Sequence, residues 1–574
     1  MKVLGFNIGS HDTAAALIDT NTGCLLGAIE QERLNRKKHT KDLPAEAAFK
    51  LLHKYSLKSQ DIAATGFGWN FELMFKSLYL SPLPESKKDI DAYYAKRDFR
   101  KFINLSSSSR KLLDILNLDN KPLNFCHHLS HHAHSYFSSG FEKATSICID
   151  GYGDCSTITI AKCSQGSIKI IKSIPFPESI GLWYSGMTYY LGFKPHCDEG
   201  ITMGLAPFGD PHESFNTSQT YLQFVESLIS FDNGSVSVNS SLLHIGHQKL
   251  GWTTSEFDTL AGSKRDSKTK ITDRYKNLAA AVQLHLENLL IRVVEHSFEL
   301  TKYRKNLCLS GGVALNCVAN YKISKHFGSK VYVPQSPGDS GVAIGSAILA
   351  ARKINPEVDF DIASFNKTSY GPSYENEIKE LSRNVASCSN YKIYNLNKKD
   401  FINKVAHSLY EGKIVGWFYQ GSEFGPRALG HRSILAKPNP IQMRDFVNKR
   451  VKFREEFRPF APAILSNHCT DYFDLDFESR HMLFAADYKD YSPHDISATV
   501  HVDNTARVQQ VDERNGLFFD LLEHFYQISG IPVLLNTSFN VKGQPIVETP
   551  QEAFDTFVGT NIDVLALEII LFEK

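Results

Sequence analysis

Five histidines within eight residues form the group of side chains best suited to metal chemistry. They occupy positions 127, 128, 131, 132 and 134. Residues four apart share one face of a helix, so the spacing favours either His127 with His131 or His128 with His132 as a metal-binding pair. Imidazoles combined with an oxygen ligand suit a divalent transition metal. Asp339, which follows an apolar strand and a Pro-Gly turn, is our candidate for that ligand.

A second candidate site lies in the basic stretch 427–458. This stretch contains nine lysines and arginines and three acids, a charge of +6 in a chain whose net charge is +1. The arginines stand among Gly, Pro and Phe residues, which favours guanidinium groups converging on an anion over a solvated charged face. Nucleic-acid binding would call for a longer basic stripe with more aromatic residues. We therefore expect a small phosphorylated ligand.

Neutral donors could complete the same anion site. The apolar run before position 536 continues into Asn536, Thr537 and Ser538, whose side chains can donate hydrogen bonds to an anion. Arg507 is a further candidate cation.

An internal repeat indicates how such residues are positioned. Residues 4–30 and 146–174 each predict three strands with a tight turn after the first, and Asp12 and Asp154 occupy equivalent places in the two turns. Glycine-rich hairpins let backbone N–H groups approach an anion, and a neighbouring Asp can hold a metal or order a water. The repeat predicts a duplicated α/β domain.

Two later segments have the order strand, glycine turn, helix. A strand at 307–309 leads into the turn 310–316, after a long helix over 275–301, and a strand at 330–333 leads through 337–341 into a helix over 342–352. This order is typical of sites for nucleotide phosphate or ribose, although neither turn is a Walker or Rossmann motif. After a polar boundary at 358–374, a second α/β unit is expected, with helices over 399–411 and 441–449 and a strand at 414–418.

Composition limits the class of protein. The chain has 574 residues, of which 42% are apolar and 22% charged, which excludes disorder, collagen and coiled coil. We find no run of the roughly 18 apolar residues that a membrane span needs, and no signal peptide. Ten scattered cysteines without a Cys-x-x-Cys pair then predict reduced thiols and a cytoplasmic location. No motif for a covalent Ser or Cys nucleophile is present.

Together these stretches resemble the O-carbamoyltransferases of the NodU/CmcH/TobZ type. The resemblance covers nearly the whole chain and is carried by 5–12, 127–131, 203–207, 310–316, 424–432, 454–462 and 532–545. It implies a duplicated actin-like ATPase domain over 1–360, similar to the tRNA threonylcarbamoyl transferases, followed by a YrdC-like α/β domain over 371–574. In this family, carbamoyl phosphate and ATP give carbamoyl adenylate in the C-terminal domain. The N-terminal domain then transfers the carbamoyl group to a hydroxyl.

The resemblance also implies roles for individual residues. His127, His131 and Asp339 match the ligands of a divalent metal, Fe(II) in the family, with Zn, Mn and Mg as alternatives. The expected catalytic residues are His11 and Asp12 on the acceptor side, with Lys452 and Arg458. The expected carbamoyl phosphate site consists of Arg427, Arg432, Lys452, Arg454, Arg458, Arg507, Asn536 and Ser538. The expected ATP site consists of Asp150, Gly151, Gly153, Gly311, Gly312, Asn316 and Asp339. Ile201 stands where family members often have Lys.

The sequence thus predicts ATP-dependent O-carbamoylation of a small-molecule, natural-product hydroxyl, with no nucleic-acid or membrane partner. The acceptor is not specified, and both a monomer and a homodimer fit. One alternative is a tRNA threonylcarbamoyl-type transferase, against which the lack of a broad basic surface counts. The other is a non-catalytic nucleotide-binding sensor, which would not need a second anion site.

Overall fold

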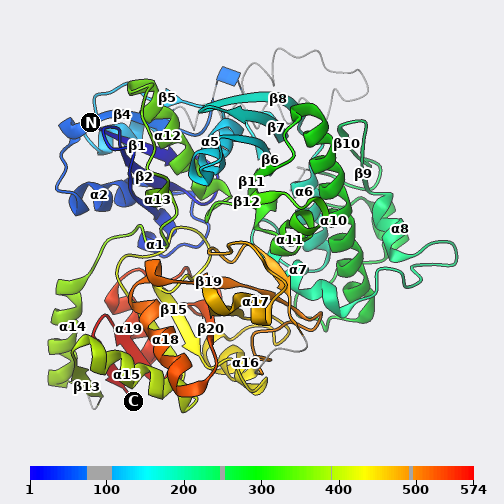
Figure 1. The fold of residues 1–574 in the computed structure, drawn as a ribbon. Coiled ribbons are helices and arrows are strands. Elements are labelled where there is room, and N and C mark those ends of the chain that lie inside the picture. Colours follow the sequence, from blue (N-terminus) through cyan, green and yellow to red (C-terminus); the bar gives the residue numbers. More distant parts are fainter. Residues whose placement is uncertain (71, 74–106, 246–251, 389–390, 490–494) are drawn as a thin grey trace. The chain divides into compact units, whose positions relative to one another are not determined.

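A computed structural model describes the whole chain except residues 71, 74–106, 246–251, 389–390 and 490–494. The described residues form two compact units (Figure 1). Unit 1 consists of Met1–Gln31 and His39–Phe365, and unit 2 consists of Glu32–Lys38 and Asn366–Lys574. The main boundary between the units, at 365/366, falls between residue 360, where the first expected domain ends, and residue 371, where the second begins. The short segment Glu32–Lys38 departs from that linear division.

The first half of unit 1 is built on a five-stranded sheet. Its strand order is β3-β2-β1-β4-β5, formed by β1 (Lys2–Asn7), β2 (Ala14–Asp19), β3 (Leu25–Glu30), β4 (Ile62–Phe67) and β5 (Leu123–Asn124). β1 pairs antiparallel with β2, and β2 with β3, whereas β4 and β5 join as parallel strands. β1 and β2 are almost entirely buried, as expected for a central pair covered on both faces.

The second half of unit 1 repeats this sheet. The order β8-β7-β6-β11-β12 has the same sequence of antiparallel and parallel pairs, in β6 (Lys143–Gly153), β7 (Ser156–Ser164), β8 (Ser167–Pro175), β11 (Asn306–Ser310) and β12 (Lys330–Tyr332). Asp12 and Asp154 both have positive φ angles, 58° and 52°, in their first hairpins. The duplication predicted from the sequence is confirmed, and unit 1 has the actin-like ATPase fold.

Helices α5 (His127–Ser139) and α12 (Val342–Ile354) pack tightly together in unit 1. Small residues make this possible, because a Cβ added at Gly345 would lie 1.8 Å from the carbonyl oxygen of Ser130. α12 also covers β1, where a Cβ at Gly5 would lie 2.2 Å from the Ala343 oxygen. The contacts of α12 with α5 and β1 fix α5, which carries the histidine cluster.

The helix expected over 275–301 is α10 (Asp273–Thr301).

Unit 2 is a mixed eight-stranded sheet with a hydrophobic core on each face. The strand order is β13-β22-β21-β14-β15-β20-β16-β19, formed by β13 (Lys392–Asn395), β14 (Val415–Phe418), β15 (Arg432–Ala436), β16 (Ala461–Leu465), β19 (Gln509–Val511), β20 (Val533–Ser538), β21 (Val564–Leu567) and β22 (Ile570–Glu573). One core contains residues of α14 (Glu375–Cys388), α16 (Gln442–Val447) and α19 (Pro550–Val558). The other contains residues of α15 (Lys398–Tyr410) and α18 (Leu517–Ser529).

The helix expected over 441–449 is shorter and changes type. α16 ends at Val447 and continues as a π-helical turn, Asn448–Lys452, after which Phe453 has a φ of 49°. Such wide turns are rare and are frequent at functional sites. The turn places Lys452 at the end of this element.

The segment Glu32–Lys38 belongs to unit 2 through its arginines. Arg33 is fully buried, donates a hydrogen bond to the Gly425 oxygen at 2.8 Å and lies 3.9 Å from the Glu423 carboxylate. Arg36 donates to the backbone oxygens of Pro545 and Ile546 at 2.9 and 2.7 Å. Among the described residues, no helix is long and apolar enough to cross a membrane.

Candidate functional site

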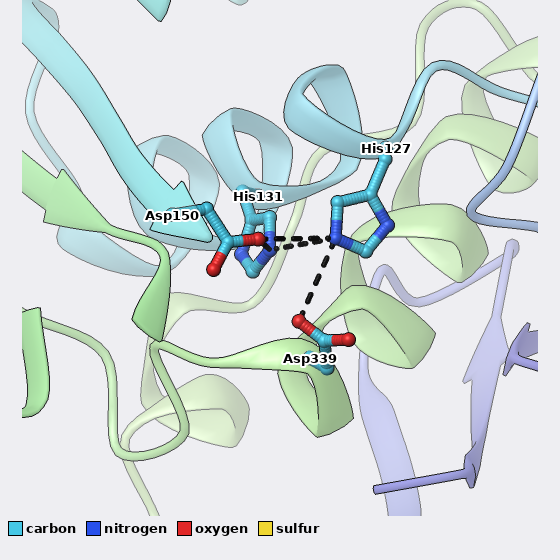
Figure 2. Close-up of side chains that lie close together, drawn as sticks. All are labelled: His127, His131, Asp150 and Asp339. Atoms are coloured by element: carbon cyan, nitrogen blue, oxygen red, sulfur yellow. Dashed lines mark hydrogen bonds and ion pairs between the residues drawn. The ribbon is translucent and has the colours of Figure 1, made fainter. Parts of the chain in front are cut away.

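Four side chains of unit 1 converge in a buried group that can hold a metal ion (Figure 2). His127 and His131 come from α5, Asp150 from β6, and Asp339 from the turn before α12. His127 Nε2 lies 3.2 Å from His131 Nε2, 3.4 Å from Asp150 Oδ2 and 3.6 Å from Asp339 Oδ1. Ligands about 2.1 Å from one tetrahedral ion are separated by about 3.4 Å. The spacing therefore fits a shared divalent ion.

The strands beside α5 decide between the two histidine pairs. His128 Nδ1 lies 3.0 Å from the Thr159 hydroxyl, and His132 contacts the hydroxyls of Ser146 and Thr159 at 2.7 and 2.9 Å. Burial is the largest effect on both rings: it lowers the pKa of His128 well below its usual value, and together with His131 it lowers the pKa of His132 to about 3. His128 and His132 are thus neutral core residues, and His127 and His131 face the carboxylates.

The orientation of His127 is fixed from three directions. Its backbone N–H donates to Asp154 Oδ2 at 2.6 Å, so the carboxylate of the β6–β7 turn caps α5. Its Nδ1 donates to the Gly68 oxygen at 3.0 Å, which leaves Nε2 directed at the centre of the group. Gly153 is required here, because a Cβ at this position would lie 2.3 Å from Cδ2 of His127.

The electrostatics of this group favour a cation. Burial opposes protonation of His127, yet the nearby Asp150 and Asp339 carboxylates raise the pKa of His127 to about 10. The same two carboxylates attract a divalent ion, and imidazole with carboxylate is a donor set suited to Fe(II), Zn or Mn. Asp150, which the sequence placed with the nucleotide, thus lies among the metal-capable side chains. The available signal was its position at the end of an apolar strand, where the turn Asp150–Asp154 begins.

The expected nucleotide residues lie partly beside this group. Gly312 N–H donates to Asp150 Oδ1 at 3.1 Å, and Gly311 has a φ of 87°. A Cβ at Gly311 would lie 2.2 Å from the Ile149 oxygen, so the turn requires glycine. Asn316 is engaged elsewhere: it caps α11 (Cys317–Phe327) and pairs with Gln283 through two amide hydrogen bonds. Its role is structural in this arrangement.

Gly151 and Ile201 both lie in regular elements of unit 1. Gly151 stands half-buried in β6 against Leu182. Ile201 is buried in α7 (Glu199–Leu205), where an apolar residue suits the core and a Lys would need a partner.

The basic motif of unit 2 builds a separate cationic cluster around Lys452. Lys452 is buried, and its Nζ donates to the Ser538 backbone oxygen at 2.7 Å, the Ser538 hydroxyl at 3.1 Å, and the Asn540 backbone and side-chain oxygens at 2.9 and 2.5 Å. All four acceptors are neutral. Burial first, and then Arg454 and Arg458, lower the pKa of Lys452 well below its usual value.

Arg454, Arg458 and Arg507 extend this cluster. Burial, followed by repulsion from Arg458 and Arg507, lowers the pKa of Arg454 to about 9. The only carboxylate described against Arg458 is Glu455, at 3.4 Å, and Glu455 also pairs with Lys542. Four cations repelling one another with so little counter-charge among the described residues constitute a site prepared for an anion.

Two of the expected anion-binding residues make hydrogen bonds within the protein. Arg432 Nη1 donates to the backbone oxygens of Tyr419, Gln420 and His431, and its guanidinium stacks 3.4 Å from the centre of the Phe418 ring. The Asn536 amide donates to Gln509 at 2.8 Å and to the Ala428 oxygen at 3.1 Å. Sequence alone does not separate an arginine that binds a ligand from one that binds backbone.

The loop that carries Arg427 is held by a buried carboxylate. One oxygen of Glu423 accepts the backbone N–H groups of Leu429, His431 and Arg432 at 2.8, 2.9 and 3.0 Å. Although burial opposes ionisation, His431, Arg33 and these N–H groups lower the pKa of Glu423. Arg427 is half-buried and lies in this loop between Glu423 and Leu429.

Models of two carbamoyltransferase domains match this chain. "Carbamoyltransferase N-terminus" covers residues 2–348, and "Carbamoyltransferase C-terminus" covers residues 406–574. The chain belongs to the carbamoyltransferase family. It is therefore an enzyme of the transferase class, as the motifs of both units predict.

Relatives of this carbamoyltransferase span its whole length. Protein sll1178 of Synechocystis is 33% identical, and the aligned region covers 100% of this chain and 96% of sll1178. Nodulation protein NolNO of Sinorhizobium fredii is 31% identical over 99% of this chain and 80% of its own. Among solved structures, component A of (R)-2-hydroxyglutaryl-CoA dehydratase from Acidaminococcus fermentans is 13% identical. It covers 62% of this carbamoyltransferase and 98% of its own chain, with a TM-score of 0.33.

Proposed function

We propose that this carbamoyltransferase acts in the cytoplasm as an ATP-dependent O-carbamoyltransferase that uses carbamoyl phosphate and modifies a small-molecule, natural-product hydroxyl. In its first half-reaction, water hydrolyses carbamoyl phosphate to carbamate and phosphate. A carbamate oxygen then bonds to the α-phosphorus of ATP as the bond to pyrophosphate breaks, which gives carbamoyl adenylate. In the second, the acceptor oxygen bonds to the carbamoyl carbon as the bond to AMP breaks. The observation that carries the proposal is the presence of two built sites of opposite charge, one in each unit.

The cationic cluster of unit 2 suits the first half-reaction. Lys452, Arg454, Arg458 and Arg507 provide the positive charge that a phosphate ester needs, and the Ser538 hydroxyl lies against Lys452 Nζ. An arriving anion would stabilise the charged form of Lys452, which burial otherwise disfavours. In this proposal these residues bind and orient carbamoyl phosphate, and Arg427 contributes a further positive charge.

The buried group of unit 1 suits the second half-reaction. His127, His131, Asp150 and Asp339 would hold a divalent metal, which we propose to be Fe(II). When bound, such an ion supplies positive charge that stabilises the phosphate of the departing nucleotide. The glycine turn at Gly311 and Gly312 lies at the same group, and such a turn suits the approach of nucleotide phosphate. Ser10 links this group to the acceptor-side residues, since its hydroxyl donates to Asp339 Oδ2 at 2.6 Å.

The first half-reaction can be tested without knowing the acceptor. The protein is incubated with ATP, carbamoyl phosphate and Fe(II) under anaerobic conditions, and carbamoyl adenylate is sought by mass spectrometry. Pyrophosphate release that depends on both substrates is the expected result. Release that requires bicarbonate and threonine instead would favour the tRNA threonylcarbamoyl alternative. Nucleotide binding without turnover would favour the sensor.

Two variants separate the half-reactions. Arg458→Ala should abolish carbamoyl adenylate formation and leave transfer from supplied carbamoyl adenylate nearly unchanged, because the cationic cluster acts only in the first step. His131→Ala should show the opposite pattern. Loss of both half-reactions in each variant would contradict the assignment of one step to each unit.

A further inference from the structure

Asp12 contacts two histidines, and the sequence pointed to only one of them. His11 Nδ1 lies 2.8 Å from Asp12 Oδ2, and His39 Nδ1 lies 2.7 Å from Asp12 Oδ1. An ionised carboxylate only accepts hydrogen bonds, so both rings donate their Nδ1–H to it. The two rings are nearly perpendicular, at 86°, with 6.3 Å between their centres. One carboxylate therefore fixes two imidazoles in different orientations.

The backbone at this carboxylate is held in an uncommon conformation. Asp12 and His39 have φ angles of 58° and 55°, a region that non-glycine residues seldom occupy. Asn7 stabilises the turn, since its side-chain amide donates to the backbone oxygens of His11 and Asp12 at 3.2 and 3.1 Å. Such conformations persist where the surroundings enforce them, and they are concentrated at functional sites.

The distances argue for hydrogen bonds and against a second metal ion. Two ligands of one ion, each about 2.1 Å away, lie about 3.0 to 3.4 Å apart, as in the buried group of His127. The N–O distances to Asp12 are 2.7 and 2.8 Å, the length of charge-assisted hydrogen bonds. His11, Asp12 and His39 thus form a hydrogen-bonded triad.

His11 is the member of this triad most open to a ligand. Its side chain is 36% exposed, against 25% for both Asp12 and His39. Because Nδ1 is engaged by Asp12, the opposite ring nitrogen, Nε2, is the one available to a bound molecule. The neighbouring Ser10 connects the turn to Asp339 of the metal-capable group.

We propose that His39 is a positioning residue for carbamoyl transfer: it fixes Asp12, and through Asp12 it fixes the ring of His11 beside the metal-capable group. This inference rests on the proposed function. The contribution of His39 is the orientation of the Asp12 carboxylate.

The charges around the triad support this arrangement. Burial opposes protonation of both rings, but their hydrogen bonds to Asp12 raise the pKa of His11 to about 9 and that of His39 to about 11. Asp339 adds to the effect on His11, and Cys197 to the effect on His39. Burial and the nearby His11 and Lys41 lower the pKa of His196 to about 4, so this ring faces His11 as a neutral group.

A pair of substitutions tests the role of His39. In His39→Asn the amide nitrogen replaces Nδ1 and can still donate to Asp12, whereas in His39→Gln it extends to the position of Nε2 and cannot. Protein labelled with ¹⁵N-histidine gives a low-field proton signal for each Nδ1–H bonded to Asp12, and His11→Gln identifies the signal of His11. Transfer is measured from supplied carbamoyl adenylate with glycerol as the probe hydroxyl.

We expect His39→Gln to lose the low-field signal of His11 and to slow transfer by about 10- to 100-fold, while carbamoyl adenylate formation continues at the wild-type rate. His39→Asn should retain the signal and most of the transfer rate. An unchanged His11 signal and transfer rate in His39→Gln would overturn the proposal. So would a second equivalent of bound metal that is lost in this variant.

Failure of the proposed function gives a different result. In that case the wild-type protein itself forms no carbamoyl adenylate and carbamoylates no hydroxyl, although the low-field signals and their response to the two substitutions are still measurable.

Discussion

At the scale of single residues, the two candidate sites use charge in opposite ways. The group around His127 combines two carboxylates with two imidazoles and is prepared for a cation. The cluster around Lys452 holds like charges against neutral oxygens and is prepared for an anion. In both sites, burial makes the unliganded charges costly, so the ligand relieves an unfavourable arrangement.

The depressed pKa values in the cationic cluster predict a pH dependence of carbamoyl phosphate binding. Lys452 and Arg454 are harder to protonate than usual in the free protein, and an anion raises their pKa values again. Binding therefore takes up protons as the pH approaches the free-state pKa of Arg454, about 9, and the apparent Kd rises with pH. Each linked proton contributes at most about tenfold per pH unit.

Isothermal titration calorimetry between pH 7 and 9.5 measures this effect. Two buffers with different ionisation enthalpies report the number of protons taken up. The phosphate group of the ligand is already ionised in this range, so it does not contribute. A Kd and a proton count that stay constant with pH would contradict the coupling.

The identity of the reactive residues was only partly predictable at this scale. The His-x-x-x-His spacing and the basic motif locate both sites, because these residue types at these spacings have few other uses. The choice of His127 over His128 depends on the packing of α5 against Ser146 of β6 and Thr159 of β7, which the helical spacing of the histidines does not specify. Likewise, the sequence predicts that Arg432 binds carbamoyl phosphate, whereas in the structure its Nη1 donates to backbone oxygens.

At the scale of elements, α5 depends on a cap from outside its own sequence. Cys126 at its N-terminus supplies no side-chain cap, and the Asp154 carboxylate takes that place by accepting the His127 N–H at 2.6 Å. The other oxygen of Asp154 accepts the N–H of Asn70, which follows β4, at 2.9 Å. The cap therefore connects the second hairpin of the repeat to the helix that carries the metal-capable histidines.

Asp154→Ala should weaken metal binding without removing a ligand. Loss of the two charge-assisted hydrogen bonds should cost about 1–3 kcal/mol of unfolding free energy. Displacement of the first turn of α5 should lower Fe(II) or Zn affinity by about 10- to 100-fold. Metal titration with a competing chelator and denaturant unfolding measure the two effects.

Thr220→Ala is the matched control for this experiment. Thr220 caps α8 (Tyr221–Glu226) in the same unit and accepts the backbone N–H of Gln223. Its loss should cost about 1 kcal/mol and leave metal affinity unchanged. Equal metal affinity in Asp154→Ala and the wild-type protein would show that the cap has no part in positioning His127.

Element order was the most predictable level of this protein. The two three-stranded repeats, the long helix and both glycine turns follow from apolar periodicity and turn residues, and the structure has them within a few residues. The π-helical turn Asn448–Lys452 could not be predicted from the periodicity of apolar residues. A π-helix has more residues per turn than an α-helix, but a single turn is too short to change the apolar pattern.

At the scale of the whole molecule, unit 2 is assembled from two separate pieces of chain. Glu32–Lys38 contributes the buried Arg33, whose guanidinium lies near the Glu423 carboxylate that anchors the Arg427 loop. The segment is basic, with Arg33, Arg36, Lys37 and Lys38 among its seven residues, but nothing in the sequence indicates its partner, because that partner is a loop nearly four hundred residues later. Linear domain division from sequence could not include it.

Removal of one partner of this buried pair should destabilise unit 2. Arg33→Met removes the arginine beside the buried Glu423 carboxylate and should cost about 3–5 kcal/mol, whereas the double variant Arg33→Met with Glu423→Gln should recover part of that loss. Denaturant unfolding followed by fluorescence, with Trp417 as the tryptophan of unit 2, measures both.

Arg514→Met provides the comparison for an exposed pair. Arg514 bonds Asp512 and Glu478 at 2.6 and 2.5 Å but is 62% exposed, so its loss should cost no more than about 1 kcal/mol. If Arg33→Met is no more destabilising than Arg514→Met, the segment Glu32–Lys38 is not an integral part of unit 2.

The two-piece construction of unit 2 limits how this enzyme can be recombined with its relatives. A chimera joined at residue 365 would combine the arginines of one parent with the carboxylate and carbonyl partners of the other. A successful exchange must carry residues 32–38 together with the C-terminal portion, as a two-site transplant. Natural recombination at a single crossover faces the same constraint, so the partner residues of this segment are expected to change together in lineages where either one changes.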